Sequence, residues 1–183
     1  MKKIILFFIF AICVCSAKAQ KAYERDTVIQ VPGKSVEQIY EGLRTWFISS
    51  FERDSRDIIQ VDDPANGSIV TKLHFPFVIK HLTWAGGSGY VTCMLDLKIR
   101  EGRFKIKLYD FIHTSTNNPN VTNWNVGLVT EELPKEWEKG MKYKQEREVY
   151  KRLFPKVTTY ADAIILSIDA YMKTFTPSEE EDW

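Results

Sequence analysis

Residues 83–90, Thr-Trp-Ala-Gly-Gly-Ser-Gly-Tyr, form the stretch of the sequence that most suggests chemistry. A glycine-rich loop binds phosphate when its backbone N–H groups and the N-terminus of a following helix face the anion. Here no Lys-Ser/Thr pair follows the glycines, and the next element is predicted to be a strand. Ser88 also lacks the glycine spacing of a hydrolase nucleophile elbow. The stretch is therefore predicted to be a hairpin connection between Trp84 and Tyr90.

Metal ions and nucleophilic catalysis need clustered ligands, and the sequence offers few. The imidazole and thiol groups after the first 19 residues are those of His74, His81, His113 and Cys93. None has the spacing of a metal motif, so we expect no metal and no cofactor. Strand alternation predicts that Cys93 points inward and His113 outward, with Cys93 opposite Asp110. A Cys–Asp pair without a base is not an activated nucleophile.

Asp110 is unusual because the same alternation places a carboxylate on a core-facing position. A strand bulge or strand end at this residue is the favoured interpretation over a functional carboxylate. An enzyme that uses isolated carboxylates such as Asp96 or Asp110 stays open as an alternative. General acid–base catalysis needs positioned pairs, and the sequence indicates none, so we expect a protein that is not an enzyme.

Residues 1–19 have the features of a Sec signal peptide. Lys2 and Lys3 precede a twelve-residue apolar run from Ile4 to Cys15, and Ala17-Lys18-Ala19 is a signal-peptidase pattern. The run is shorter than the about 20 residues of a membrane-spanning helix, and no second long apolar segment follows. We therefore predict export to the periplasm or the cell exterior, without a transmembrane segment after cleavage.

Cleavage changes the charge and the cysteine content. The loss of three lysines takes the 25 basic residues to 22 against 24 acidic ones, a net charge of −2. Both this charge and export argue against nucleic-acid binding. Only Cys93 remains, so an internal disulfide is excluded.

Residues 90–113 have the clearest pattern, two alternating strands around a Glu101-Gly102 turn. A two-residue turn predicts pairs such as Ile99 with Phe104 and Leu95 with Leu108 on the core face. On the same face the pattern places Ile112, and on the opposite face it pairs Thr92 with Phe111 and Tyr90 with His113. Far from the turn that opposite face is aromatic, and we predict that it binds a ligand or is covered by another segment. The candidate ligand-binding residues are Tyr90, Met94, Tyr109, Phe111 and His113.

Other elements follow from periodicity and capping signals. Strands are predicted at 27–31, 58–61, 68–74 and 75–84, and a short one at 124–129. Ser35 and Gln38 form a capping box at the start of an amphipathic helix. Two later helices are predicted, a charged one over 135–153 and a C-terminal one that Thr158 or Thr159 caps and Pro177 ends.

The sequence resembles a family of exported, Bacteroidetes-type bacterial domains of unknown function with a TATA-binding-protein-like fold. The residues that carry the resemblance are Ser35–Tyr40, Trp46-Phe47 and Phe51, Ile58–Asp63 with Gly67–Ile69, and the hairpin from Asp96 to Asp110. It covers residues 24–112 and the last helix. The resemblance implies a fold and an exported bacterial setting, and it brings no catalytic residues.

We therefore expect an α+β domain with a curved antiparallel sheet, in the order strand, helix, strands, helix (TBP-like or helix-grip-like), and with two main helices on one face. The domain is predicted to span 20–177, with a charged loop-plus-helix insertion at 114–155 and an acidic tail at 178–183. The leading hypothesis is a non-enzymatic binding module whose partner is an unknown protein. A carrier of a small apolar ligand, held between the sheet and the C-terminal helix, is the alternative.

Overall fold

The computed structural model describes residues 20–51, 58–116 and 122–177. The predicted signal peptide and acidic tail lie outside the described residues. The described elements are β1 (Arg25–Gln30), α2 (Val36–Ser50), β2 (Ile59–Asp63), β3 (Ser68–Phe77), the 3-10 helix η1 (Leu82–Gly87), β4 (Gly89–Arg100), β5 (Arg103–Ser115), β6 (Gly127–Leu128), the 3-10 helix η2 (Lys135–Trp137) and α4 (Lys144–Thr174). The predicted order of strand, helix, strands and helix is confirmed.

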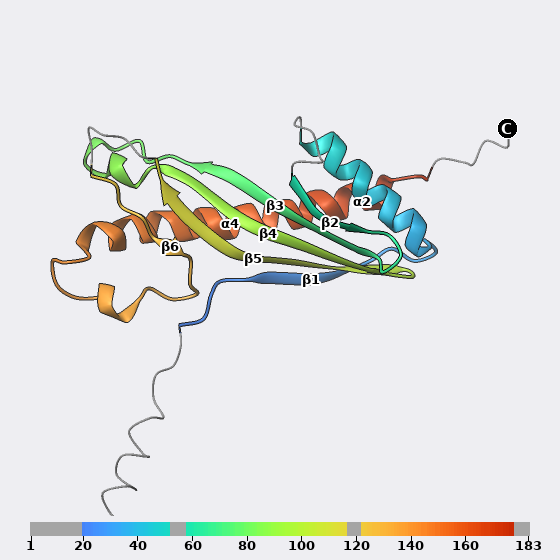
Figure 1. Ribbon diagram of the computed structural model, residues 1–183, viewed down its shortest axis with the longest axis horizontal. Coiled ribbons are helices and arrows are strands. Elements are labelled where there is room, and N and C mark those ends of the chain that lie inside the picture. Colours follow the sequence, from blue (N-terminus) through green and yellow to red (C-terminus); the bar gives the residue numbers. More distant parts are fainter. Residues whose placement is uncertain (1–19, 52–57, 117–121, 178–183) are drawn as a thin grey trace, which may run out of the picture.

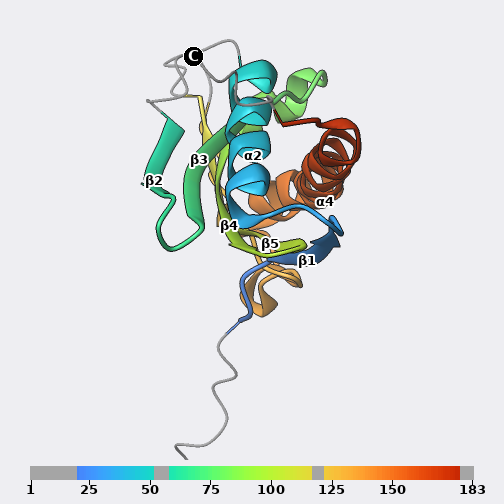
Figure 2. The ribbon, with the colours of Figure 1, turned by 90° about the vertical axis from the view of Figure 1, so that its right-hand side faces the viewer.

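The strands form one antiparallel sheet in the order β1-β5-β4-β3-β2, and β6 pairs with β5. The sheet is curved, and both long helices lie on the same side of it (Figures 1 and 2). The inward side chains of the sheet and the buried faces of the helices make one hydrophobic core. The expected α+β architecture is therefore present, and no helix of the described residues covers the other face of the sheet, which we call the open face.

Helix α2 forms where the capping pattern predicts. The Ser35 hydroxyl accepts a hydrogen bond from the Gln38 backbone N–H at 3.3 Å, and the Gln38 side chain accepts one from the Ser35 backbone N–H at 3.0 Å. This reciprocal pair satisfies two N–H groups that a helix start leaves without partners. The apolar stripe of the helix, including Ile39, Leu43 and Phe47, is fully buried in the core.

The β4–β5 hairpin has the predicted register near its turn and a different one beyond it. Ile99 pairs with Phe104 and the register continues unchanged to Met94 opposite Tyr109. A β-bulge then adds one residue to β5 at Asp110, which has a left-handed φ of 52°. The favoured interpretation of Asp110, a bulge, is confirmed.

The bulge overturns the predictions for the residues that follow it. A one-residue shift in a strand turns every later side chain to the opposite face. Phe111 and His113, predicted to point outward, are 0% and 1% exposed. Ile112, predicted to be core, is 42% exposed and pairs with Thr92. The predicted pairing of Tyr90 with His113 is wrong as well, because Tyr90 pairs with Thr114.

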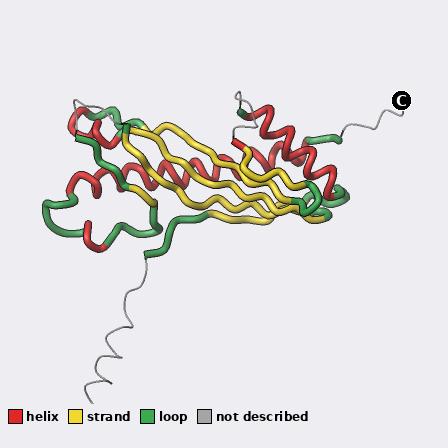
Figure 3. The backbone as a smooth tube through the Cα atoms, in the orientation of Figure 1, coloured by secondary structure: helices red, strands yellow, loops and turns green. Residues whose placement is uncertain are grey.

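Two predicted boundaries are also corrected. Strand β3 continues through Pro76 to Phe77, so no separate strand covers 75–84. The charged helix predicted over 135–153 begins only at Lys144, and it continues without a break into the predicted C-terminal helix as one helix, α4, which runs along the whole sheet (Figure 3). Pro155 lies inside it, where a proline normally breaks a helix. The fully buried Leu153 and Val157 on either side of Pro155 hold both halves on the core.

Residues 127–130 of the segment 114–155 lie at the β5 side of the sheet. Strand β6 pairs with β5 beyond β1, and Val126 and Val129 are buried in the core. The Tyr150 hydroxyl donates a hydrogen bond to the Thr130 carbonyl at 2.7 Å, which ties the segment to α4. The segment thus extends the sheet sideways, and Tyr90 on the open face remains 44% exposed. Among the described residues, no helix has the length and apolar content that crossing a bilayer requires.

Candidate functional site

The structure divides the predicted ligand-binding residues between the two faces of the sheet. Tyr90, Met94 and Tyr109 lie on the open face. Phe111 and His113 lie on the helix face and belong to the core. Met94 and Tyr109 are paired across β4 and β5, and the Lys107 ammonium lies 5.3 Å from the centre of the Tyr109 ring.

His113 has a structural environment. Its Nδ1 lies 3.1 Å from the Val126 backbone nitrogen and its Nε2 lies 3.0 Å from the Gly87 carbonyl oxygen. The Phe77 ring meets the imidazole edge-on, with 5.4 Å between centroids. Burial lowers the pKa of His113, and the hydrogen bond to Gly87 opposes this effect only in part. His113 therefore fastens β5 to the η1–β4 junction and to the start of β6.

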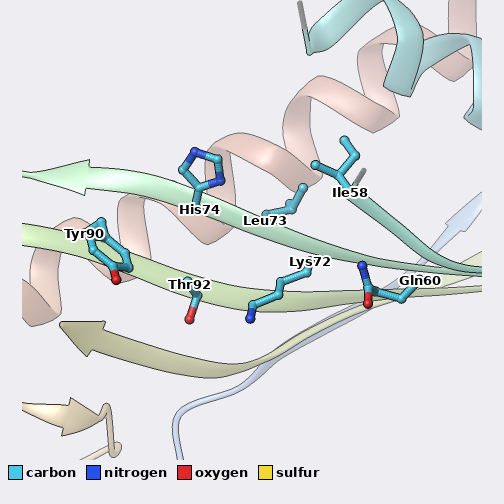
Figure 4. Close-up of a pocket in the computed structure, with 7 residues that line it drawn as sticks. All are labelled: Ile58, Gln60, Lys72, Leu73, His74, Tyr90 and Thr92. Carbon is cyan, nitrogen blue, oxygen red and sulfur yellow. The ribbon is translucent and has the colours of Figure 1, made fainter. Parts of the chain in front are cut away.

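A groove of about 470 Å³ lies on the open face, at the side of β3 that faces β2 (Figure 4). We call it the Tyr90 groove, and its lining residues are Ile58, Gln60, Lys72, Leu73, His74, Tyr90 and Thr92. Figure 4 shows Tyr90, Thr92 and Lys72 on the open face, with α4 behind the sheet. Of the five predicted ligand-binding residues, the Tyr90 groove includes only Tyr90.

A second groove of about 420 Å³ lies on the helix side of the same strand, between β3 and α4. We call it the Tyr160 groove, and its lining residues are Phe75, Pro76, Phe77, Val78, Lys156, Thr159, Tyr160 and Ala163. The rings of Phe75 and Tyr160 stack with centroids 3.9 Å apart. A further hollow lined by Lys80, His81, Lys151 and Arg152 continues from it along α4.

Most of these groove residues are not predicted from the sequence. Alternation along residues 68–77 could have placed Lys72 and His74 on the open face together. No sequence signal indicates that β2 stops pairing at Thr71, and this stop is what opens the Tyr90 groove. The Tyr160 groove joins residues far apart in the chain, so only the tertiary structure reveals it.

The other candidate reactive groups are separated from one another. Cys93 is 1% exposed, and burial raises the pKa of its thiol to about 12. Asp110 is exposed on the bulge, whereas Asp96 lies on the open face with Lys98 Nζ 3.7 Å from its Oδ1. Within the described residues, no group of three or more His, Cys, Asp or Glu side chains is arranged to hold a metal ion.

The glycines of residues 83–90 serve close packing. A Cβ atom on Gly86 would lie 1.9 Å from the Thr122 carbonyl oxygen, and one on Gly89 would lie 2.0 Å from the Thr114 carbonyl oxygen. One on Gly87 would lie 2.3 Å from the Val149 side chain. The short 3-10 helix η1 occupies most of residues 83–90 and joins β3 to β4, which are antiparallel. The stretch is thus the hairpin connection that the sequence predicts.

The curved antiparallel sheet, with two helices on one face and grooves beside β3, defines the chain as an α+β domain of TBP-like fold. Residues 26–114 match the family model described as "Domain of unknown function (DUF4468) with TBP-like fold", and this part of the chain belongs to that family. The predicted family resemblance is confirmed.

Two solved structures resemble the whole domain. A DUF4468 family protein from Bacteroides ovatus ATCC 8483 has 16% identity and a TM-score of 0.55, and the alignment covers 86% of this chain and 90% of that chain. A TBP-like protein from Parabacteroides distasonis ATCC 8503 has 10% identity and a TM-score of 0.58, with coverage of 90% and 99%. At these identities the likeness shows the fold alone. No curated protein matches the chain.

Proposed function

We propose that the domain is a non-enzymatic binding module that acts after export through Sec, in the periplasm or outside the cell. The observation that carries the proposal is the pair of grooves that flank one stretch of β3, one on the open sheet face and one beside α4. The exposed side chain of Tyr90 lines the first groove and that of Val78 the second, and concave sites of this kind are where proteins bind ligands and partners.

The chemistry of the reactive groups supports a binding role over catalysis. The Cys93 thiol stays protonated at neutral pH, and His113 is committed to two backbone groups. Neither side chain is accessible to a substrate. Among the described residues, neither Asp96 nor Asp110 forms a hydrogen bond or ion pair with a histidine. Turnover of a hydrolase or isomerase substrate by the purified protein, abolished by one substitution at either aspartate, would refute this part of the proposal.

Support for export comes from the sequence of residues 1–19, with its basic start, apolar run and Ala-Lys-Ala site. Sequencing the N-terminus of the protein recovered from the periplasm or the culture medium tests it. We expect a chain that begins at Gln20, and recovery of the uncleaved chain from the cytoplasm contradicts the proposal.

Site-specific photo-crosslinking tests the binding role itself. A photoreactive amino acid at Tyr90 is expected to give a discrete covalent adduct in the organism that makes the protein. The same amino acid at Leu166, which is 66% exposed on α4 and away from both grooves, serves as the control. Equal labelling at the two positions, or none at Tyr90, speaks against a binding surface at this groove.

A carrier of a small apolar ligand is the second candidate, because the Tyr160 groove lies between the sheet and the C-terminal helix and is mostly apolar. Deeper between these elements, Val149, Leu153, Val157 and Ala161 are fully buried. Such a ligand would therefore occupy the groove beside Tyr160. Native mass spectrometry of the protein from its own host decides between the candidates, since a carrier retains a bound small molecule and a protein-binding module does not.

A further inference from the structure

One edge of the sheet is only partly covered. Strand β2 pairs with β3 between Ser68 and Thr71, while β3 continues to Phe77 (Figure 1). From Lys72 to Phe77, no strand in the described part of the chain pairs with the outer side of β3. We call this stretch the free edge of β3. An unpaired strand edge presents backbone N–H and C=O groups that can pair with another strand.

The hydrogen-bond pattern shows which residues present these groups. The Ile99 N–H of β4 donates to the carbonyl of Gly67, the residue before β3, at 2.8 Å. Gly67 and Ile99 are therefore a hydrogen-bonded pair of the β3–β4 ladder. Such pairs recur at every second residue of an antiparallel ladder. The odd-numbered residues of β3 therefore bond to β4, and the even-numbered ones point the other way. Lys72 and His74 direct their N–H and C=O groups to the free edge, where Pro76 offers only a carbonyl.

The two grooves lie on opposite faces of this edge. Successive side chains of a strand point to opposite faces of a sheet. A strand added along Lys72–Phe77 would place one row of its side chains against the Tyr90 groove and the alternate row against the Tyr160 groove. Backbone pairing and two side-chain grooves are the combination by which sheet edges bind extended peptides.

The charge of the edge defines the partner. Lys72 and His74 line the Tyr90 groove and Lys156 lines the Tyr160 groove, and neither lining includes an aspartate or glutamate. Within the described residues, Lys72 and Lys156 have no ion-pair partner. The rest of the Tyr160 groove is mostly apolar, with Val78 68% exposed at its side. Acidic side chains fit the first groove and apolar side chains the second.

We propose that the free edge of β3 binds an extended acidic segment of a partner protein by strand addition. Its acidic residues face Lys72 and His74 and its alternate apolar residues face Phe75 and Tyr160. This proposal rests on the proposed binding function and names its partner class. A second copy of this chain fits less well, because edge-to-edge pairing would bring Lys72 of both copies onto the same face of one ladder, and like charges close together across strands are destabilising.

The probe is a synthetic eight-residue peptide that alternates glutamate and valine, titrated into the protein spanning residues 20–183. Binding is measured by calorimetry and by the amide resonances of Lys72 and His74, which are expected to shift. A lysine–valine peptide is the charge control and is expected not to bind. The backbone control is the same glutamate–valine peptide with N-methyl groups on alternate residues. It is prepared in two frames, one methylated on every glutamate and the other on every valine. One of the two frames is expected to lose binding because its N–H groups toward β3 are gone.

Protein variants locate the site. Lys72→Glu is expected to weaken binding about tenfold through charge reversal. Arg100→Glu makes the same charge change near the β4–β5 turn, away from the free edge, and is expected to leave binding unchanged. His74→Pro removes a backbone donor at a position where edge strands tolerate proline, and it is expected to abolish binding. If that variant does not fold, the N-methylated peptides test the same backbone contact.

Several results would overturn strand addition. These are equal binding of the acidic and basic peptides, full binding of both N-methylated frames, or equal losses in Lys72→Glu and Arg100→Glu. Self-association that Lys72→Glu strengthens, with no peptide binding, would assign the edge to a second copy. If the peptide fails to bind but the Tyr90 crosslink still captures a partner, the binding function stands and strand addition falls. If the crosslink also fails, the proposed function falls with it.

Discussion

The backbone N–H of Val126 donates a hydrogen bond to Nδ1 of His113, with 3.1 Å between the nitrogens. Nδ1 can accept this bond only when it carries no proton, so Nε2 holds the proton and donates to the Gly87 carbonyl at 3.0 Å. The imidazole is therefore neutral and in one tautomer in the folded protein. Its protonation would break the bond to Val126.

This arrangement predicts a pH dependence of stability. Burial lowers the pKa of His113 in the folded state relative to about 6.5 in the unfolded chain. Below that pH the unfolded state takes up the proton more readily, so the free energy of unfolding falls as the pH drops, until the folded-state pKa is reached. We expect urea denaturation to give a lower unfolding free energy at pH 5.5 than at pH 7.5.

His113→Gln is expected to reduce this difference and to cost about 1–3 kcal/mol at pH 7.5, because the buried backbone groups lose their partner. His74→Gln, at an exposed histidine, is the matched control and is expected to retain the wild-type pH dependence. A His113→Gln variant with the full wild-type dependence would show that other groups cause it.

The bulge at Asp110 makes a prediction about backbone strain. Asp110 has a φ of 52° and an exposed side chain, so glycine should fit there without strain. We expect Asp110→Gly to be neutral or to stabilise the protein slightly, and Asp110→Val to destabilise it by about 1–2 kcal/mol. Thermal and urea unfolding measure both. Equal destabilisation by glycine and valine would point to a side-chain role for Asp110.

Deletion of Asp110 is a stronger test of the same feature. Without the extra residue, Phe111 would take the core-facing position opposite Cys93, and Ile112 and His113 would keep their partners Thr92 and Val91. We therefore expect the deletion variant to unfold cooperatively in urea, because no buried side chain changes its face. Loss of cooperative unfolding in this variant would show that the bulged backbone itself is needed for packing.

The glycines before β4 should tolerate no side chain. Gly86→Ala and Gly89→Ala each place a methyl group about 2 Å from a backbone carbonyl oxygen. We expect each to destabilise the protein by about 1–3 kcal/mol or more through forced backbone shifts. Thr83→Ala, at an exposed position in the same connection, should change stability by less than about 0.5 kcal/mol. Wild-type stability of the glycine variants would contradict the close-packing role of these glycines.

Cys93 should be unreactive in the folded protein. Its thiol is buried and its pKa is raised to about 12, and the reactive form of cysteine is the thiolate. In the protein spanning residues 20–183, we expect a thiol reagent to label Cys93 only after denaturation. Leu166→Cys introduces an exposed thiol as a positive control that reacts at once. Rapid labelling of Cys93 in the native protein would reveal an opening of the sheet core.

The sequence was sufficient for the fold where local chemistry specifies it. The capping box at Ser35 and the two-residue turn after Arg100 depend only on neighbouring residues, and both are confirmed. The bulge at Asp110 was identifiable as an anomaly, because a carboxylate on a core position conflicts with the pattern. The pattern alone leaves open whether β5 bulges or ends at Asp110, and only a bulge turns Phe111 and His113 into the core.

Other features depend on contacts that no local pattern encodes. Pro155 predicts a helix end, but burial of Leu153 and Val157 against the sheet outweighs the lost hydrogen bond. The Tyr160 groove depends on packing between β3 and α4, and the Tyr90 groove on where β2 stops. For these reasons Tyr90 is the one predicted site residue that lines either of these two grooves, whereas Lys72, His74 and Lys156 are not predicted from the sequence.

The position of β1 has a consequence for the order in which the chain assembles. Strands β3, β4 and β5 follow one another directly and pair as neighbours, whereas Arg25 of β1 pairs with Leu108 of β5. Contacts between distant residues form late, because closing the long intervening loop costs entropy before any pairing is gained. During synthesis β1 leaves the ribosome first, and its partner strand β5 is completed much later. We therefore expect the β3–β5 meander to nucleate folding and β1 to join last, with low φ-values for substitutions at Val28 and Ile29.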